Sequence, residues 1–214
     1  MPDQRIISRE EISGFAREFR RTFVNSLSGF KSLHLCGTID FQHRTNLSVM
    51  NSVIHIGADP PLLGMVFRPD VVERHTLTNL EQTGFFTLSQ VTEPMCRQAH
   101  QTSARYPQEV SEFDATGLTP WYSGRLPAPY VAESPVKIGL QLQERHHIMV
   151  NATLLVVGRV LEVILPDAVI GPDGFVDLEQ AGVLAASGLD AYFRTQRVAR
   201  YGYAKPGQLP ELLP

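Results

Sequence analysis

Alternating hydrophobicity is the feature that most restricts how this 214-residue sequence folds. Apolar side chains occupy every second position over residues 33–41, and the pattern returns over 136–143. A period of two places successive side chains on opposite faces of a β-strand, so residues 33–41 predict a half-buried strand. Four further stretches are extended in character: 46–56, 62–67, 84–91 and 148–165. We therefore expect a mainly β domain of six or seven strands.

Short helices are expected between some of these strands. Thr76 is a candidate N-cap for a helix through Gln82 that Gly84 ends, and Pro94 suits the first turn of another helix running to Gln101. Helices this short cannot cover a face of a parallel α/β sheet. The pattern therefore favours an antiparallel barrel, with residues 62–67 as an inner strand and a bend or bulge at Gly158.

The N-terminal 30 residues predict a separate element. Residues 8–11 have the form of a capping box, and apolar residues then recur at helical spacing to Leu27, with Gly29 as the stop. The four arginines on the opposite face also suit a membrane surface or a nucleic acid. A solvated face is favoured, because interspersed glutamates dilute the charge. We expect residues 1–30 to form one amphipathic helix packed on a domain of residues 31–214.

Composition limits the class of protein. The chain is 43% hydrophobic with a formal net charge of −3, which argues against disorder and against a nucleic-acid footprint. No apolar run approaches the roughly 20 residues of a membrane span, and no secretory signal is visible. Cys36 and Cys96 cannot form a disulfide framework and fit small buried hydrophobes. The sequence predicts a cytoplasmic protein that binds neither nucleic acid nor membrane.

Familiar catalytic motifs are missing from the sequence. It has no GxGxxG, GxxxxGK[ST], HExxH or GxSxG pattern. His146 and His147 are adjacent in an extended segment, so their side chains point to opposite faces and cannot chelate together. We expect no metal site.

One strand candidate carries an unusual row of polar side chains. Asn46, Ser48, Met50 and Ser52 share one face, and Asn51 lies opposite. Such a face suits a flat heteroaromatic ligand with its own donors and acceptors. A solvated edge strand is the other interpretation, and the spacing does not separate the two.

A phosphate site is the second candidate. Arg68 follows a strand, and Arg74 and His75 precede a predicted helix that Thr76 would cap. Phosphate groups bind guanidinium donors and the free amides of a helix start. An ordinary surface loop with solvated arginines is the alternative.

These residues belong to an ordered series of motifs. The series is Asn46-x-Ser48-x-Met50-Asn51-Ser52, Asp59-Pro60-Pro61-Leu62, His75-Thr76-x-x-Asn79, Gly84-x-Phe86, Ser111-Glu112-Phe113-x-x-x-Gly117-Leu118, Val131-Ala132-Glu133-Ser134-Pro135-Val136 and Gly158-Arg159-Val160. Over residues 33–205 it resembles the flavin reductase-like, FMN-binding split-barrel family. The resemblance implies an antiparallel, Greek-key split β-barrel with short peripheral helices.

The resemblance also implies a set of FMN-binding residues. Those along the isoalloxazine ring would be Asn46, Leu47, Ser48, Val49, Met50, Asn51 and Ser52. Arg68, Arg74, His75 and Thr76 would hold the terminal phosphate, and Ser103 would approach the ring. Relatives often carry Pro or Thr where this chain has Val49, so that contact is expected through the backbone.

Two further features stay open by the same resemblance. His100 fits either a contact to substrate or flavin, or a surface residue. Residues 187–192 and 201–203 resemble the tails of some members and are expected to make core or dimer contacts rather than to act in catalysis.

The implied activity is hydride transfer from NADH or NADPH to flavin N5, which needs no catalytic acid or base from the protein. Relatives are usually homodimers, and a monooxygenase or another acceptor would take the electrons. An FMN-binding electron-transfer or flavin-carrier protein without nicotinamide activity is the alternative. A barrel that binds a small ligand other than flavin is a third possibility.

Overall fold

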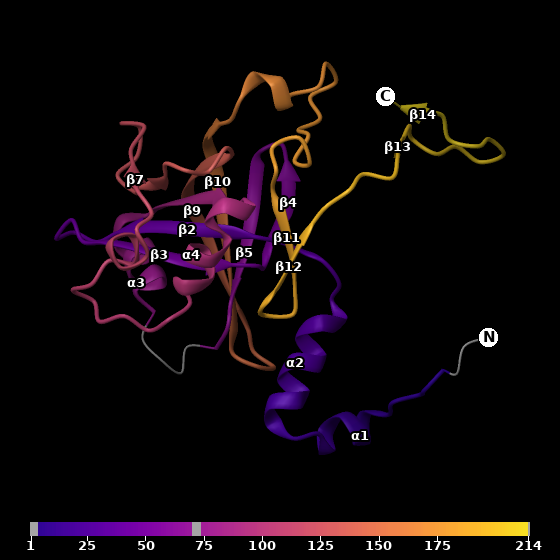
Figure 1. The fold of residues 1–214 in the computed structure, drawn as a ribbon, viewed down its shortest axis with the longest axis horizontal. Helices are drawn as coiled ribbons and strands as arrows, with labels where there is room; N and C mark the ends of the chain where they lie inside the picture. Colours follow the sequence, from indigo (N-terminus) through magenta and orange to yellow (C-terminus); the bar gives the residue numbers. More distant parts are fainter. Residues whose placement is uncertain (1–3, 70–73, 214) are drawn as a thin grey trace.

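The computed structural model describes residues 4–69 and 74–213, and its centre is a seven-stranded sheet (Figure 1). The strand order is β3-β2-β6-β9-β10-β5-β4, and every pairing is antiparallel. Their bounds are β2 His34–Ile39, β3 Thr45–Met50, β4 Val53–Ala58, β5 Pro61–Phe67, β6 Phe85–Gln90, β9 Lys137–Ile148 and β10 Thr153–Ile164. The mainly β, antiparallel prediction is confirmed. No ladder joins the terminal strands β3 and β4 within the described residues.

Smaller elements surround the sheet. The helices are α1 Arg9–Gly14, α2 Arg17–Leu27, α3 His75–Thr83, α4 Cys96–Gln101 and α5 Glu112–Thr116, with 3-10 turns at Glu93–Met95 and Asp167–Val169. The short strands are β1 Lys31–Ser32, β7 Pro120–Trp121, β8 Tyr130–Val131, β11 Leu184–Ser187, β12 Ala191–Arg194, β13 Arg200–Tyr201 and β14 Leu212–Leu213. None of the helices in the described part of the chain combines the length and apolar character of a membrane span.

Strand β2 differs from its prediction as a half-buried strand, because all six of its residues are buried. It lies between β3 and β6, and α3 packs against it. Leu35 belongs to one core cluster and its neighbour Cys36 to another, so each face of β2 meets its own core. The alternating polar residues are therefore interior ones.

Two predicted strands have different limits in the structure. The stretch 46–56 is two strands, because the chain breaks at Asn51 and Ser52 between β3 and β4. The stretch 148–165 begins as the tip of the β9–β10 hairpin, and β10 starts only at Thr153. The bulge predicted at Gly158 is present, and a Cβ there would lie 2.5 Å from Phe86 Cζ. Strand β5 is an inner strand, as predicted.

The N-terminal segment is two helices rather than the single helix predicted. Ser8 caps α1 by accepting a 3.1 Å hydrogen bond from Glu11 N, as the capping box indicated. The chain is extended at Phe15 and Ala16, directly after Gly14, a residue with low helix propensity. No side chain of either helix is buried, and Phe19 is 58% exposed. The apolar face is thus largely uncovered in the single chain.

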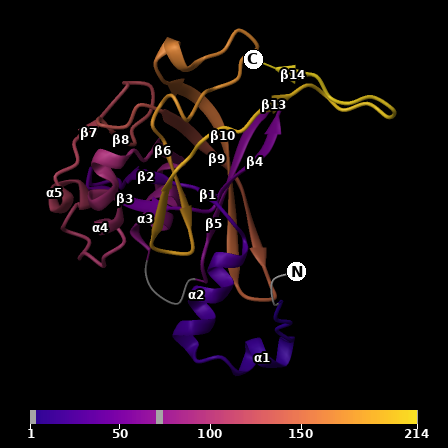
Figure 2. The same ribbon diagram turned by 45° about the vertical axis from the view of Figure 1, so that its right-hand side comes forward.

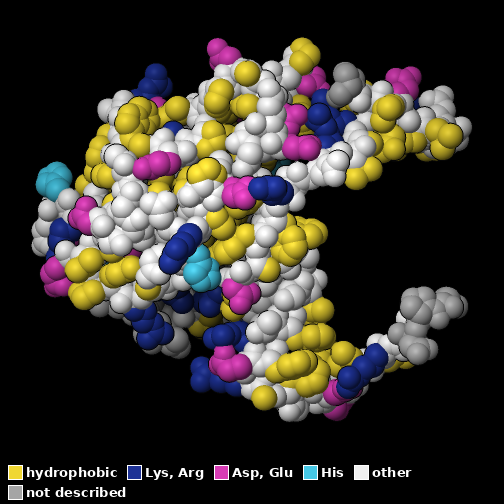
Figure 3. Space-filling view, in the orientation of Figure 1, with side chains coloured by type: hydrophobic (Ala, Val, Ile, Leu, Met, Phe, Trp, Pro, Cys, Tyr) yellow, Lys and Arg dark blue, Asp and Glu magenta, His cyan; other side chains and the backbone are white. Residues whose placement is uncertain are grey.

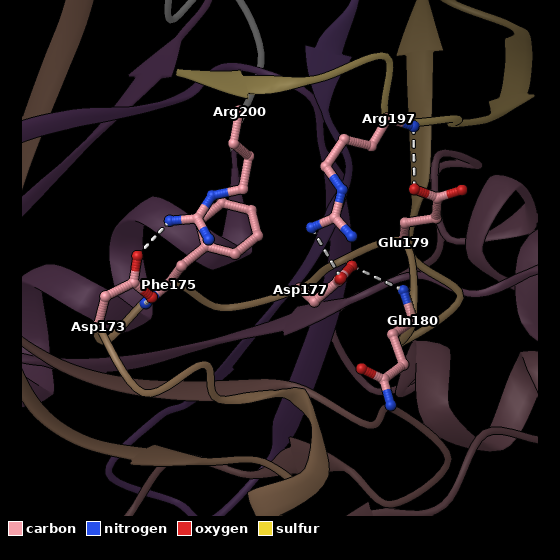
Figure 4. A network of polar contacts seen from close by, with 7 residues as sticks. All are labelled: Asp173, Phe175, Asp177, Glu179, Gln180, Arg197 and Arg200. Carbon is pink, nitrogen blue, oxygen red and sulfur yellow. Dashed lines mark hydrogen bonds and ion pairs between the residues drawn. The ribbon is translucent and has the colours of Figure 1, made fainter. Parts of the chain in front are cut away.

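The C-terminal segment continues after β12 and extends away from the sheets (Figures 1 and 2). Its base is fastened to the 173–180 loop by two arginines (Figure 4). Arg197 Nη1 lies 3.1 Å from Asp177 Oδ2, while Arg200 pairs with Asp173 and stacks 4.0 Å from the Phe175 ring centroid. Beyond this anchor Tyr203 is 93% exposed, so residues 201–203 make no core contact in the single chain.

Candidate functional site

A cavity of about 520 Å³ lies beside β3, at the free edge of the sheet. The sequence analysis named twelve candidate residues, and all but one of them line this cavity. These eleven are Asn46, Ser48, Val49, Met50, Asn51, Ser52, Arg68, Arg74, His75, Thr76 and Ser103. Leu47 does not: its side chain is fully buried in a core cluster. The structure therefore brings the candidates together, and their binding of flavin stays a prediction.

Strand β3 presents backbone groups to the cavity because it has a neighbour on one side only. Leu47 N–H points away from β2 and donates a 2.8 Å hydrogen bond to Glu112 Oε2. In an antiparallel ladder, residues two apart direct their backbone groups to the same side. The N–H and C=O of Val49 therefore point to the same free edge, where Val49 lines the cavity. A ligand at this edge meets backbone donors and acceptors.

A polar network fixes the start of α3 against β3. Thr76 Oγ1 lies 2.8 Å from Asn46 Nδ2 and 2.8 Å from Ser48 Oγ. Asn46 and Ser48 thus share a face, as the two-residue period predicted. The N-cap of α3 is Arg74, not Thr76, whose buried side chain lies in the first turn. The prediction of Thr76 as the N-cap is wrong, because its hydroxyl links two elements instead.

Two arginines also line the cavity. Arg68 follows β5 and Arg74 precedes α3, and neither side chain pairs with a carboxylate of the described residues. Burial lowers the pKa of Arg68, and the charges of Arg74 and Arg21 lower it further. Arg74 Nε is buried without a hydrogen-bond partner among the described atoms. Two like charges and an unused donor are the requirements of an anion site.

Comparisons with known proteins identify the family of the chain. The family model described as Flavin reductase like domain matches residues 32–178. This chain belongs to the flavin reductase-like family. A family member from Shewanella frigidimarina NCIMB 400, assigned as a flavin reductase with a split barrel domain, is 46% identical. Its TM-score is 0.91, over 94% of this chain and 100% of that one.

More distant structures share the family fold. Nitrilotriacetate monooxygenase component B of Bacillus cereus is 17% identical with a TM-score of 0.79, over 92% of this chain and 98% of its own. An NADH:FAD oxidoreductase of Streptomyces globisporus C-1027 is 14% identical with a TM-score of 0.67, over 92% and 100%. A curated relative from Aquifex aeolicus (strain VF5), whose name states no function, is 26% identical over 127 residues. The match spans 58% of this chain and 64% of that relative's length.

The cavity of this flavin reductase-like chain includes part of the tail for which a core contact was predicted, and Tyr192 does pack against a core cluster. Leu189 and Tyr192, from the 187–192 tail that was expected to make core or dimer contacts, line the cavity. Asn51 Nδ2 donates a 3.1 Å hydrogen bond to Gly188 O. Tyr192 Oη lies 2.6 Å from His100 Nδ1, and His100 is an exposed residue that also lines the cavity. The tail motif was visible in the sequence, but its position was not.

Glu112 is the second residue that sequence reasoning left without a role. It is buried and is the only acidic residue among the described ones that line the cavity. Burial raises the pKa of its carboxyl, while the hydrogen bond from Leu47 N–H opposes that shift. Its position in the Ser111–Leu118 motif was the available signal.

The remaining reactive side chains lie elsewhere. Within the described residues no group of three or more His, Cys, Asp or Glu is placed to hold a metal ion. Cys36 is fully buried, and burial raises the pKa of its thiol well above the ordinary value. His146 lies 2.7 Å from Glu144 on the exposed end of β9.

Proposed function

We propose that this protein binds FMN and acts as an NAD(P)H:flavin oxidoreductase. The observation that carries the proposal is a single cavity that combines a polar strand edge with two arginines. The cavity is lined by the free polar edge of β3 and by Arg68 and Arg74, and Arg74 Nε is buried without a partner among the described atoms. A planar heteroaromatic ring joined to a phosphate matches that arrangement.

Each of the predicted residues has a place in this proposal. Asn46, Ser48, Asn51, Ser52 and the Val49 backbone, which line the cavity, would hold the polar edge of the ring, and Met50 and Ser103 would also contact it. The side chains of Arg68, Arg74, His75 and Thr76 also line the cavity and would hold the phosphate. Leu47 does not line the cavity and would act through its backbone, because its N–H donates a hydrogen bond to Glu112, which does line the cavity.

The chain supplies orientation and shelter rather than an acid or base. When bound, FMN supplies N5 as the acceptor of a hydride from a reduced nicotinamide. Thr76 holds Asn46 and Ser48 in one orientation, so a ring on β3 meets a fixed set of polar atoms. Apolar side chains of Leu33, Phe67 and Leu189 also line the cavity and limit water.

We extend the proposal to partners and assembly. The names of two structural neighbours, a monooxygenase component and an NADH:FAD oxidoreductase, support a nicotinamide donor and a monooxygenase or similar acceptor. A homodimer would cover the exposed apolar face of α1 and α2. A reducing, cytoplasmic setting suits the free thiols of Cys36 and Cys96.

Steady-state oxidation of NADH and NADPH with added FMN tests the activity. We expect turnover with one donor or both. FMN binding without turnover by either donor would leave the electron-transfer or flavin-carrier function in place of the reductase.

Replacing Arg68 and Thr76 together by Ala tests the site. We expect loss of FMN binding in calorimetric titration. The matched control is Arg97→Ala/Thr78→Ala, which removes an exposed arginine and the hydroxyl two positions along α3. If the wild type does not bind FMN, the remaining possibility is a protein of this fold that binds a small ligand other than flavin.

A further inference from the structure

A tyrosine–histidine pair in the cavity wall has no role in the proposed flavin chemistry. Tyr192 Oη on β12 lies 2.6 Å from His100 Nδ1 on α4, and both residues line the cavity. The two rings meet edge to face, at 87° and with their centroids 5.8 Å apart. Hydride transfer from a nicotinamide to a flavin needs no acid from the protein. The pair is therefore free to serve a different ligand of the same cavity.

The elements that carry the pair are fastened to one another. Arg194 of β12 donates hydrogen bonds of 2.7 and 2.8 Å to the carboxylate of Glu93, in the 3-10 turn that leads into α4. Strand β11 adds a 2.9 Å hydrogen bond from Leu184 N to Val91 O. The ring of Tyr192 packs against a core cluster. Its hydroxyl is thus held at a defined point of the cavity wall.

The wall beside Tyr192 is apolar. Ala186 is its cross-strand partner on β11, and Ala186 and Leu33 belong to the cluster against which Tyr192 packs. Both line the cavity, as does Leu189 in the turn between β11 and β12. Hydrophobic side chains are also visible on the outer surface over this hairpin (Figure 3). Apolar side chains beside a single hydroxyl suit a carbon skeleton that carries one oxygen acceptor.

The Tyr192 hydroxyl is able to donate a proton to such an oxygen. Burial raises its pKa, and electrostatic interactions with Cys96 and Asp190 raise it further, so the hydroxyl stays protonated at neutral pH. With a hydrogen on Nδ1, His100 donates to Tyr192 Oη, and the phenolic hydrogen is left for a ligand. His100 is exposed, so its imidazole exchanges protons with solvent.

We infer that Tyr192 donates a proton to the carbonyl oxygen of a conjugated carbonyl compound, which the FMN-loaded protein reduces directly, with His100 as the positioning residue. The inference rests on the proposed function, because it takes the cavity to hold FMN. In this step the β-carbon of the substrate accepts a hydride from the reduced flavin, and its carbonyl oxygen accepts the Tyr192 proton. The resulting enol becomes the saturated carbonyl compound in water. The flavin is left oxidised, and Tyr192 recovers its proton from His100, which takes one from solvent.

Anaerobic stopped-flow kinetics of the photoreduced, FMN-loaded protein test this step. The probe is trans-cinnamaldehyde, a flat and apolar conjugated aldehyde. Reoxidation by dioxygen is the reference reaction, because free reduced flavin undergoes it in water without a protein. We expect Tyr192→Phe to lower the rate constant for cinnamaldehyde about a hundredfold relative to that for dioxygen. His100→Ala should lower it about tenfold, and imidazole added to the buffer should restore it.

The matched control is Tyr201→Phe, since Tyr201 is 61% exposed on β13 and lies outside the cavity lining. We expect it to react with both oxidants as the wild type does. Calorimetric titration of the oxidised, FMN-loaded protein with acetophenone gives a readout without turnover. The Kd should rise about fivefold in Tyr192→Phe, which corresponds to the loss of one hydrogen bond to the carbonyl.

The outcomes separate the inference from the proposed function. A wild type that binds FMN but does not reduce cinnamaldehyde would overturn the inference alone. Equal losses with cinnamaldehyde and dioxygen in Tyr192→Phe, or an unchanged Kd for acetophenone, would do the same, because they indicate a purely structural tyrosine. Absence of FMN binding by the wild type would instead overturn the proposed function, and the inference with it.

Discussion

Glu112 Oε2 accepts a 2.8 Å hydrogen bond from the backbone N–H of Leu47. The two residues are 65 positions apart, and the contact closes the free edge of β3 with the short helix α5. An edge strand otherwise exposes unpaired backbone groups. Here one group is satisfied by a side chain, and the next outward-facing residue, Val49, is left to the cavity.

Glu112 gives the first prediction, a stability that depends on pH. Its carboxyl pKa is raised in the folded protein, so folding favours the protonated form. The stability it contributes is complete below the ordinary carboxyl pKa and is lost as pH rises through the raised value. Glu112→Gln keeps an acceptor for Leu47 N–H and cannot ionise. In scanning calorimetry we expect the melting temperature of Glu112→Gln to be higher than that of the wild type at pH 7. Near pH 4 the two melting temperatures should be equal.

The control for this variant is Glu109→Gln, since Glu109 is exposed on the same loop. A wild type more stable than Glu112→Gln at pH 7 would contradict the prediction. Glu112→Ala removes the acceptor altogether. We expect it to lose about 1–3 kcal/mol of unfolding free energy, because Leu47 N–H is then left buried without a partner.

Thr76→Val tests the link between α3 and β3. The change keeps the shape of the side chain but leaves Asn46 Nδ2 and Ser48 Oγ without their shared partner. We expect a loss of about 1–3 kcal/mol in urea unfolding, because Asn46 is buried. We also expect about tenfold weaker FMN binding. Thr78→Val on the same helix should change neither quantity, and equal effects of the two variants would refute the role of Thr76.

Arg74→Lys tests whether Arg74 Nε, which has no partner among the described atoms, binds a phosphate. Lysine keeps the charge but not the planar fork of donors. We expect FMN affinity to fall about tenfold and riboflavin affinity to stay the same, since riboflavin has no phosphate. Fluorescence titration with both flavins measures the difference. An equal loss for riboflavin would show that Arg74 supports the fold of the site instead.

The buried side chain of His34 leads us to expect that the stability of the folded protein falls at acid pH. Its side chain is buried, its Nδ1 has no described partner, and burial lowers its pKa to about 4. A depressed histidine pKa gives stability that is complete above the ordinary value of 6.5 and is lost as pH falls toward 4. The shift corresponds to roughly 3 kcal/mol of unfolding free energy at the acid end.

Urea unfolding between pH 7.5 and 4.5 measures this contribution. His34→Met, which cannot take up a proton, should lose less stability over that range than the wild type does. His147→Gln is the control, because His147 is exposed on β9. Parallel pH profiles for wild type and His34→Met would exclude a role for His34 in acid sensitivity.

The local pattern of the sequence predicted which segments are extended, but not how deep they lie. Period two identified β2 and β9, and Gly84 ended α3 in a left-handed conformation as expected. The polar residues of β2 indicated a solvated face. They are buried because α3 and a second core cluster cover both sides, and that covering comes from residues far along the chain.

The candidate site was also predictable in part from the sequence. The chemistry of its residues, hydroxyls and amides on β3 and arginines between β5 and α3, was present in the sequence and suggested a flat heteroaromatic ligand and a phosphate, while the flavin itself was implied by the family resemblance. The roles of Glu112 and Tyr192 were not predictable, since each enters the cavity from a segment more than 60 residues away from β3.

By itself the sequence determined which segments are extended, some of the turns that end them and the types of side chain available to a ligand. These are properties of neighbouring residues, because backbone conformation and the side on which a side chain lies are set within a few positions. Only the tertiary structure decided that β3 is an edge strand, that Thr76 links two elements and that the tail forms a wall of the cavity. Such outcomes depend on which distant segments pair, and no local period records that choice.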